Sequence, residues 1–419
     1  MDVKRRGFAE HVRVEEALKR YFEKVDVKRL QSEDVLLAEG LGRVLGEDVR
    51  AGFDVPHFDR SAVDGYAVRA EDTYGASSTN PMVLDPVGAV EFGKAPDEAL
   101  GTGQAVRIAT GAPLPYGADA VVMLEYAEEV GGNRVEVYRP ITPGDNVSLR
   151  GEDVKEGELV LRDETILRPQ DIGMLAAVGR TRIKVVRRPV VAILSTGNEL
   201  VEPGTPLELG RTVDTNRYML AAAVKDAGGK PLDIGIVSDV AGEIEDRVSK
   251  GLRLADMVLV SGGTSVGSRD LVPEVVNALG GPGIVVHGIA MRPGRPTALA
   301  AVGDRPIALL PGHPVAALIA FDTLVRPVMA RMLGAPVGGG RRGVVRARML
   351  RRVPSRIGFR DFVRVVVRRV GDGYAAEPVR VTGAGVISSM VKANGMVVIP
   401  EGVEGGEEVE VTLFRPLED

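Results

Sequence analysis

The stretch "MVLVSGGTSVGSRDLVPEVVNAL", residues 257–279, indicates the fold class of this chain. It begins as a short apolar run, passes through a glycine-containing loop and ends in a segment that predicts a helix. Glycines between a buried strand and a helix let main-chain N–H groups approach an anion. The loop 261–270 has neither the lysine of a P-loop nor the spacing of a dinucleotide fingerprint, and it ends on Asp270. It therefore predicts another kind of phosphate site, with a carboxylate beside it.

The surrounding region, residues 187–333, alternates predicted strands with predicted helices. The expected strands are 189–195, 233–238, 256–261, 283–289 and 306–312, and the expected helices are 214–229, 241–254 and 315–333. Either Asp214 or Thr215 would cap the first of these helices. The alternation predicts an α/β domain with a mostly parallel sheet, whose ligand site lies at the carboxyl ends of the strands.

The rest of the chain divides into three regions by its pattern of apolar and turn-forming residues. Residues 1–50, together with 153–186, predict a helical linker region, with helices at 13–25 and 38–49. Short apolar runs between turn-forming residues predict a β-rich insert over 51–152. Residues 334–419 begin with a glycine-rich linker and then predict strands only.

Length and composition limit the class of protein. A chain of 419 residues is too long for one core and indicates several domains. A net charge of −5 argues against general binding to nucleic acid or to a membrane surface. The sequence shows no apolar run near the ~20 residues of a membrane span and no signal-peptide pattern at its start. We expect a cytoplasmic protein.

The absence of cysteine excludes disulfides, thiol nucleophiles and thiolate-bound zinc. The four histidines are scattered without metal-ligand spacing: His11, His57, His287 and His313. Any bound metal should therefore be a hard cation with oxygen ligands, such as Mg²⁺.

Three acidic residues, Glu199, Asp239 and Asp270, each follow a predicted strand of the α/β region. They should gather around one cleft, and three carboxylates would repel a phosphate unless a divalent cation lay between them. We therefore expect these residues to be metal ligands for Mg²⁺. The alternative is that they are solvated acids in ordinary tight turns.

Positive charge comes from Arg292 and Arg295, on a turn constrained by proline and glycine. A guanidinium can bind a phosphate or an oxyanion through two parallel hydrogen bonds. Plain surface arginines are the competing interpretation.

A second group of polar residues lies in and just after the β-rich insert. Asp59 and Asp64 flank a polar segment, Thr110 lies in the rigid "TGAPLP" loop, and Asp153 follows in "RGEDV". Structural turns in a β-domain are the simpler interpretation. If these residues instead take part in the site of the α/β region, a dimer could bring them there from the partner subunit.

With both groups in view, the chain resembles the molybdopterin molybdenumtransferase family, which includes the C-terminal domain of gephyrin. The resemblance extends over essentially the whole chain. It rests on the motifs "FDRSAVDGYAV", "RIATGAPLPYGADAVVMLE", "GEDVKEG", "STGNEL", "DTNRYML", "SGGTSVGSRD", "RPGRP" and "LPGHPVAAL".

The resemblance implies a C-terminal β-barrel and a homodimer whose active sites are shared between subunits. It implies that adenylylated molybdopterin and molybdate or tungstate are the substrates. The adenylate would be cleaved in a Mg²⁺-dependent step, with release of AMP and insertion of the metal into the dithiolene. A molybdopterin adenylyltransferase would be the upstream partner.

The resemblance also assigns residues to the site. The implied catalytic residues are Asp64, Thr110, Asp153, Glu199, Asp239 and Asp270. The expected binding residues for the pterin phosphate or pyrophosphate are Ser261, Gly262, Gly263, Ser265, Gly267, Arg292, Arg295, Pro311, Gly312 and Pro314.

Four positions depart from the family pattern. His287, Arg292 and Arg295 stand where lysines are usual, and His313 replaces the asparagine of "LPGNP". Arginine keeps the charge but not the geometry of lysine. His313 could alter the preference between molybdate and tungstate.

Two other functions remain as alternatives. A molybdopterin adenylyltransferase would have a similar α/β domain, but the insert and the C-terminal domain favour the molybdenumtransferase. A scaffold protein like gephyrin would not require the acidic residues. A dinucleotide-dependent dehydrogenase is disfavoured, because no G-x-G-x-x-G follows a strand.

Overall fold

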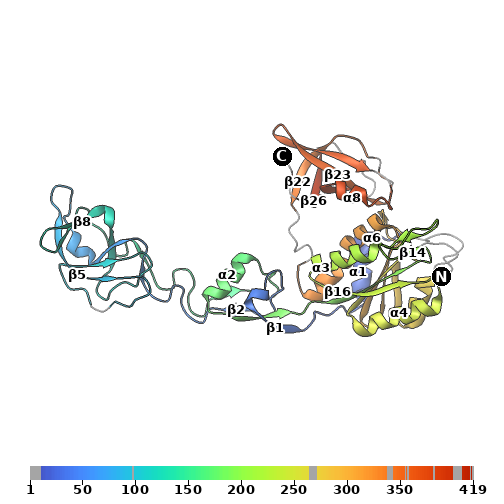
Figure 1. The fold of residues 1–419 in the computed structure, drawn as a ribbon, viewed down its shortest axis with the longest axis horizontal. Coiled ribbons are helices and arrows are strands. Elements are labelled where there is room, and N and C mark those ends of the chain that lie inside the picture. The colour runs from blue at the N-terminus through green and yellow to red at the C-terminus, as the bar shows by residue number, and fades with distance from the viewer. Residues whose placement is uncertain are drawn as a thin grey trace. The chain divides into compact units, whose positions relative to one another are not determined.

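The computed structural model describes residues 11–96, 99–263, 271–336, 343–353, 355, 358–380, 383–399, 408–415 and 417 (Figure 1). The chain divides into two compact units. One comprises Met1–Glu33, Gly42–Val44 and Val185–Asp419, and the other comprises Asp34–Leu41 and Leu45–Lys184. The predicted domain boundaries remain predictions.

The first unit contains the predicted α/β sheet, in the strand order β16-β13-β17-β21-β20-β18. The strands are β16 (Lys230–Val237), β13 (Val190–Thr196), β17 (Met257–Ser261), β21 (Arg305–Leu310), β20 (Ala298–Val302) and β18 (Pro282–His287). The pairings from β16 to β21 are parallel, and β20 is antiparallel to both of its neighbours. The sheet is thus mostly parallel, as predicted.

Helices cover both faces of this sheet, which explains why its central strands are apolar throughout. Val191 and Ile193 of β13 point into a core shared with α1 (Val14–Lys24), α3 (Asn216–Asp226), α6 (Pro314–Ala320) and α7 (Arg326–Leu333). The alternate residues Ala192 and Leu194 point into a second core, shared with α4 (Ala241–Leu254) and α5 (Leu271–Leu279). Figure 1 shows α4 apart from α1, α3 and α6. None of the helices in the described parts of the chain is long and apolar enough to cross a membrane.

The predicted helix 315–333 is divided by one π-helical segment, Phe321–Val325, between α6 and α7. Pro327 explains the break, because proline has no N–H to donate and its ring clashes with the preceding turn. Gly334 ends α7 in the left-handed conformation, at φ 64°.

The C-terminal part of the first unit forms the expected β-barrel. Its strands are β22 (Val344–Met349), β23 (Arg360–Val370), β24 (Gly373–Arg380), β25 (Gly395–Ile399) and β26 (Glu408–Leu413). They pair in the order β23-β24-β22-β26-β25, and a further pairing of β25 with β23 closes the ring. The short strand β19 (Met291–Arg292) adds to β23 in parallel. The short helix α8 (Ser388–Lys392) lies between β24 and β25.

The second unit is built on a sheet with the order β7-β4-β6-β5-β9-β8. Its strands are β7 (Ala120–Met123), β4 (Gly65–Val68), β6 (Gln104–Ile108), β5 (Met82–Val90), β9 (Arg134–Val137) and β8 (Ala127–Val130). Smaller pairs join β3 (Arg60–Ser61) with β10 (Val147–Ser148), β2 (Val49–Arg50) with β11 (Leu159–Leu161), and β1 (Ser32–Leu36) with β12 (Arg182–Val186). The helix α2 (Pro169–Ala177) follows β11. The expectation of a β-rich insert is confirmed.

The predicted helix 38–49 is wrong. Only a 3₁₀ turn, Leu37–Glu39, forms there. Gly42 follows with φ 71°, a left-handed conformation that no helix interior accepts. Gly40 lies against the side chains of Ile172 and Ile183, which leave no room for a side chain at this position.

Candidate functional site

The loops after the parallel strands lie at one edge of the sheet. Ser195 of β13 pairs with Ser261 of β17, and Ser261 pairs with Leu310 of β21, so these strands end side by side. The four segments that begin at or directly after the ends of β13, β16, β17 and β21 are called here the carboxyl-edge loops. They are residues 196–199, 238–240, 261–263 and 311–314. The structure thus brings Glu199, Asp239 and Gly262 to the same edge.

Asp239 is held by residues of the neighbouring loop. The Thr196 hydroxyl donates a hydrogen bond of 2.6 Å to Asp239 Oδ1, and the Asn198 backbone N–H lies 3.4 Å from Oδ2. The Asp239 backbone N–H donates in return to Asn198 Oδ1 at 3.1 Å. The carboxylate of this half-buried residue is therefore fixed in orientation.

Glu199 is exposed and folds back over Gly197. Both of its carboxylate oxygens would lie 2.8 Å from a Cβ atom at position 197, so any side chain there would displace it. The Gly197 N–H donates to the Val237 carbonyl at the end of β16. Glu199 and Asp239 are thus anchored on adjoining loops.

The described part of the glycine loop runs from Ser261 to Gly263. The Gly262 N–H donates to the Leu310 carbonyl at 3.0 Å, which ties the loop to β21. Gly262 has φ 100°, and a side chain on it would collide with the Thr196 carbonyl. The main chain can pass so close to β13 only because the residue is glycine. Ser265, Gly267 and Asp270 lie outside the described residues.

The loop 311–314 contacts the glycine loop, because the Ser261 hydroxyl donates to the Pro311 carbonyl at 3.4 Å. A Cβ atom added at Gly312 would lie 3.6 Å from Gly262 Cα. Pro314 begins α6, and the His313 ring lies against Gly385. Pro311, Gly312 and Pro314 are therefore placed beside the predicted phosphate loop, and their binding roles remain predictions.

Arg292 binds a residue that the sequence did not indicate. Its Nε and Nη2 donate to the two carboxylate oxygens of Asp361 in β23, at 2.6 and 2.7 Å. This pairing raises the pKa of Arg292 further, through the hydrogen bonds to Asp361 first and then its charge, against an opposing effect of burial. Arg295 is exposed on the same turn. That either arginine meets a substrate anion remains a prediction.

In the second unit, Asp64 and Thr110 form a pair, which we call the Asp64–Thr110 pair. Asp64 Oδ1 accepts hydrogen bonds from the Thr110 backbone N–H at 2.7 Å and from its hydroxyl at 2.9 Å. These bonds, the backbone one first, lower the pKa of Asp64, so this exposed carboxylate is ionised at neutral pH. Asp153 is also exposed, and its backbone N–H donates to the Val55 carbonyl at 3.1 Å.

The described residues contain no group of three histidine, aspartate or glutamate side chains that could hold a metal ion. Glu199 and Asp239 are two oxygen donors, and the third predicted ligand, Asp270, is outside the described residues. Two carboxylates together with substrate phosphates are a usual environment for Mg²⁺. The donors present therefore fit the cation that the sequence predicts.

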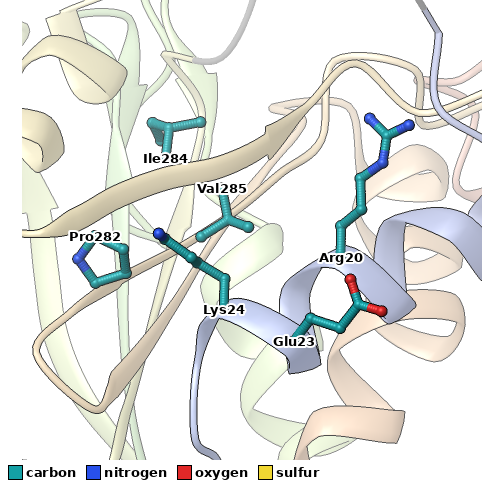
Figure 2. Close-up of a pocket in the computed structure, with 6 residues that line it drawn as sticks. All are labelled: Arg20, Glu23, Lys24, Pro282, Ile284 and Val285. Carbon is teal, nitrogen blue, oxygen red and sulfur yellow. The ribbon is translucent and has the colours of Figure 1, made fainter.

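A surface pocket of about 340 Å³ lies elsewhere, between α1 and β18. Figure 2 shows its lining residues, which mix charged and apolar side chains: Arg20, Glu23, Lys24, Pro282, Ile284 and Val285. Pro282 pairs with Val302, which pairs with Arg305 at the start of β21. The pocket is thus near the edge opposite the carboxyl-edge loops, and it contains none of the predicted site residues.

Several residues of the site were missed by the sequence interpretation. Thr196 and Asn198 hold Asp239, and Asn216 at the start of α3 donates to Ser261 and Gly312. All three stand inside motifs already singled out, "STGNEL" and "DTNRYML". Their polar side chains next to a strand end or a helix start were the available signal.

Comparison with known proteins agrees with this arrangement. Family models match residues 12–179 as "MoeA N-terminal region (domain I and II)", residues 192–331 as "Probable molybdopterin binding domain", and residues 346–414 as "MoeA C-terminal region (domain IV)".

Individual relatives cover most of the chain. The molybdopterin molybdenumtransferase of Bacillus subtilis is 35% identical over 394 residues, which are 93% of this chain and 91% of that protein. That of Nostoc sp. is 40% identical over 300 residues, 71% of this chain and 68% of that protein. The solved structure of the molybdopterin biosynthesis protein MoeA from Pyrococcus horikoshii is 36% identical. It superposes with a TM-score of 0.83, and the match covers 97% of this chain and 100% of that one. The chain therefore belongs to the molybdopterin molybdenumtransferase (MoeA) family.

Proposed function

We propose that this chain is an enzyme of molybdenum cofactor biosynthesis that inserts molybdate or tungstate into adenylylated molybdopterin and releases AMP. The observation that carries the proposal is the hydrogen bond that holds Asp239 to Thr196. It lies at the edge of the sheet where β17 ends and the glycine loop begins. Family membership supplies the substrate class. The site supplies a phosphate-type loop with carboxylates beside it.

Mg²⁺ would be held by Glu199 and Asp239, with Asp270 as the third predicted ligand. When bound there, the cation would neutralise phosphate charge and make the anhydride easier to cleave. The protein's own contribution is to hold the acids in place. Asp239 keeps its orientation through Thr196, and Glu199 keeps its place over Gly197.

The glycine loop would bind the phosphates through main-chain N–H groups. Arg292 Nη1 has no hydrogen-bond partner within the described ranges, so it is the atom of that guanidinium left to donate to an anion. The ionised Asp64, oriented by Thr110, would act from the second copy of a homodimer. Asp64 accepts both bonds at Oδ1, and its Oδ2 stays available to substrate.

Other features of the proposal rest on the family resemblance. A molybdopterin adenylyltransferase would supply the adenylylated substrate, and the reaction would take place in the cytoplasm. The alternative that the chain is itself the adenylyltransferase accounts for the α/β domain alone. It leaves the insert and the barrel without a role.

The test is an assay with purified protein, adenylylated molybdopterin, Mg²⁺ and either oxyanion, in which AMP release and metal incorporation are followed together. We expect AMP release that requires both Mg²⁺ and the oxyanion. Formation of adenylylated molybdopterin from ATP, with no oxyanion-dependent AMP release, would instead establish the adenylyltransferase.

The shared site is tested by mixing two inactive variants. Asp64→Asn and Asp239→Asn should each be inactive, and a mixed dimer should regain activity at the one site that holds both native residues. A mixed dimer as inactive as its parents would show that each subunit supplies all of its own site.

A further inference from the structure

Asn216 connects two of the carboxyl-edge loops. Its side-chain Nδ2 donates to Ser261 Oγ and to the Gly312 carbonyl, each at 2.7 Å. Ser261 begins the glycine loop, and Gly312 lies in the loop after β21. Asn216 is 5% exposed, so water has little access to these two bonds.

We propose that Asn216 is a positioning residue of this enzyme, which sets the distance between the glycine loop and the loop 311–314 and so shapes the site for the substrate phosphates. The inference rests on the proposed function. Asn216 acts through Ser261 and Gly312, whose main chain would meet the substrate.

Asn216 is itself held by Asp214. The carboxylate of Asp214, 2% exposed, accepts from the Ser195 hydroxyl at 3.0 Å and from the Asn216 backbone N–H at 3.1 Å. Asp214 also accepts from the Arg217 backbone N–H and from Arg217 Nε. The side chain of Asp214, rather than that of Thr215, thus caps α3 and fixes its first turn to the end of β13.

The segment 214–216, which leads into α3, therefore joins the ends of three parallel strands. Asp214 reaches β13 through Ser195, and Asn216 reaches β17 through Ser261 and the segment after β21 through Gly312. Buried hydrogen bonds of this kind hold a site in a narrow range of geometries. A shift of either loop would break one of the two bonds.

The amide of Asn216 donates to two acceptors at once. Its nitrogen has two N–H groups and serves two acceptors, which a hydroxyl or a carboxylate at this position cannot do. Its Oδ1 is buried and has no partner among the described residues. An unsatisfied buried carbonyl lowers stability, so the residue contributes through its donors rather than through overall stabilisation.

The experiment compares Asn216→Asp and Asn216→Ala with the wild-type enzyme. Asn216→Asp keeps the shape but turns an acceptor toward the Gly312 carbonyl. Asn216→Ala removes both bonds without adding repulsion. We expect kcat/KM for adenylylated molybdopterin to fall about 100-fold in Asn216→Asp, the loss typical of a site displaced by about 1 Å. Binding of AMP and of pyrophosphate, measured by calorimetry, should weaken in both variants.

A coupling measurement separates positioning from general destabilisation. If Asn216 acts through Ser261, the double variant Asn216→Ala with Ser261→Ala should lose little more activity than Asn216→Ala alone. Asn277→Asp is the matched control. Its Oδ1 accepts from the Ile284 N–H at 2.8 Å near the opposite edge, and a carboxylate can accept the same bond. This control should keep wild-type activity.

Three outcomes would overturn the inference while leaving the proposed function intact. These are wild-type kinetics in a folded Asn216→Asp variant, additive losses in the double variant, or a crystal structure of Asn216→Ala with Gly262 and Gly312 still in contact. Absence of oxyanion-dependent AMP release in the wild-type enzyme would instead overturn the proposed function. A lower melting temperature with unchanged KM and unchanged AMP binding would show a structural role only.

Discussion

The carboxyl-edge loops and the Asp64–Thr110 pair both present carboxylates, but they hold them differently. At the sheet edge, Asp239 is half-buried and bonded across two loops, above a buried layer that includes Asp214 and Asn216. In the insert, Asp64 is exposed, and among the described residues its carboxylate is held by Thr110. The difference predicts that changes in the buried layer beneath the sheet edge affect stability, whereas changes at the Asp64–Thr110 pair affect catalysis with little effect on folding.

The largest expected effect is that of Asp239→Asn on the reaction. An amide still accepts from Thr196 but brings no negative charge to a cation or to a developing charge, so AMP release should fall at least ~10²–10³-fold. Thermal stability should change little. Asp246→Asn, which removes the same charge from an exposed position of α4, is the control and should be fully active. Comparable activity in the two variants would show that Asp239 has no part in the reaction.

The next largest effect concerns stability beneath the sheet edge. Arg217 is 4% exposed and binds Asp214, Asp233 and Glu202. Burial lowers its pKa, but the hydrogen bond to Glu202 and the surrounding negative charges outweigh burial and raise it. Arg217→Met would leave Asp214 buried without its partner, so unfolding by urea should show a loss of about 3–5 kcal/mol.

The insert offers a variant to compare with Arg217→Met, because the arginine of its ion pair with Asp54 is exposed. Arg150 Nε binds Asp54 at 2.5 Å with the arginine side chain 59% exposed. Arg150→Met should therefore lower the free energy of unfolding much less than Arg217→Met does. Equal losses in the two methionine variants would contradict the contrast between a buried and an exposed network.

The elements that the sequence predicted correctly share a physical origin. Strands β13, β17 and β21 are buried on both faces and therefore appear as unbroken apolar runs. Strand β20 was missed because its segment, "ALAAV", is short and rich in small residues, after a proline-containing turn. The helix expected at 38–49 failed because three glycines, at 40, 42 and 46, outweigh the helical spacing of its apolar residues.

At the site, the sequence predicted the positions of some residues but not the hydrogen bonds between them. Glu199 and Asp239 could be placed at the sheet edge because each follows a strand. The bonds that support the site join residues far apart in the chain: Asn216 and Gly312 are separated by 96 positions, and Arg292 and Asp361 by 69. No local pattern specifies such pairs, because they arise only when the strands are in register.

A smaller effect is expected from Thr110→Val, which removes one of the two bonds to Asp64. The backbone N–H remains and is the larger cause of the lowered pKa, so the Asp64 pKa should rise only part of the way to its ordinary value. Any contribution of Asp64 to stability is present above that ordinary value of about 3.9 and is lost as pH falls through the lower folded pKa.

NMR titration of the Asp64 carboxyl carbon would measure the change in its pKa. AMP release should fall about 10-fold, with unfolding by urea unchanged. A pKa as high as that of a free aspartate would mean that the hydroxyl, not the backbone, holds Asp64.

The smallest effect is expected from Arg292→Lys. This variant tests whether Arg292 binds the substrate or only Asp361 of the barrel strand β23. Lysine keeps the charge but cannot bind both oxygens of Asp361, so stability should fall by about 1 kcal/mol or less. KM for adenylylated molybdopterin should rise only a few-fold, because the charge that attracts the phosphates remains. Arg292→Met removes that charge as well and should raise KM further. If Arg292→Met lowers stability while KM stays at the wild-type value, Arg292 holds Asp361 and has no part in binding. The anion would then be met by Arg295 and the main chain of the glycine loop.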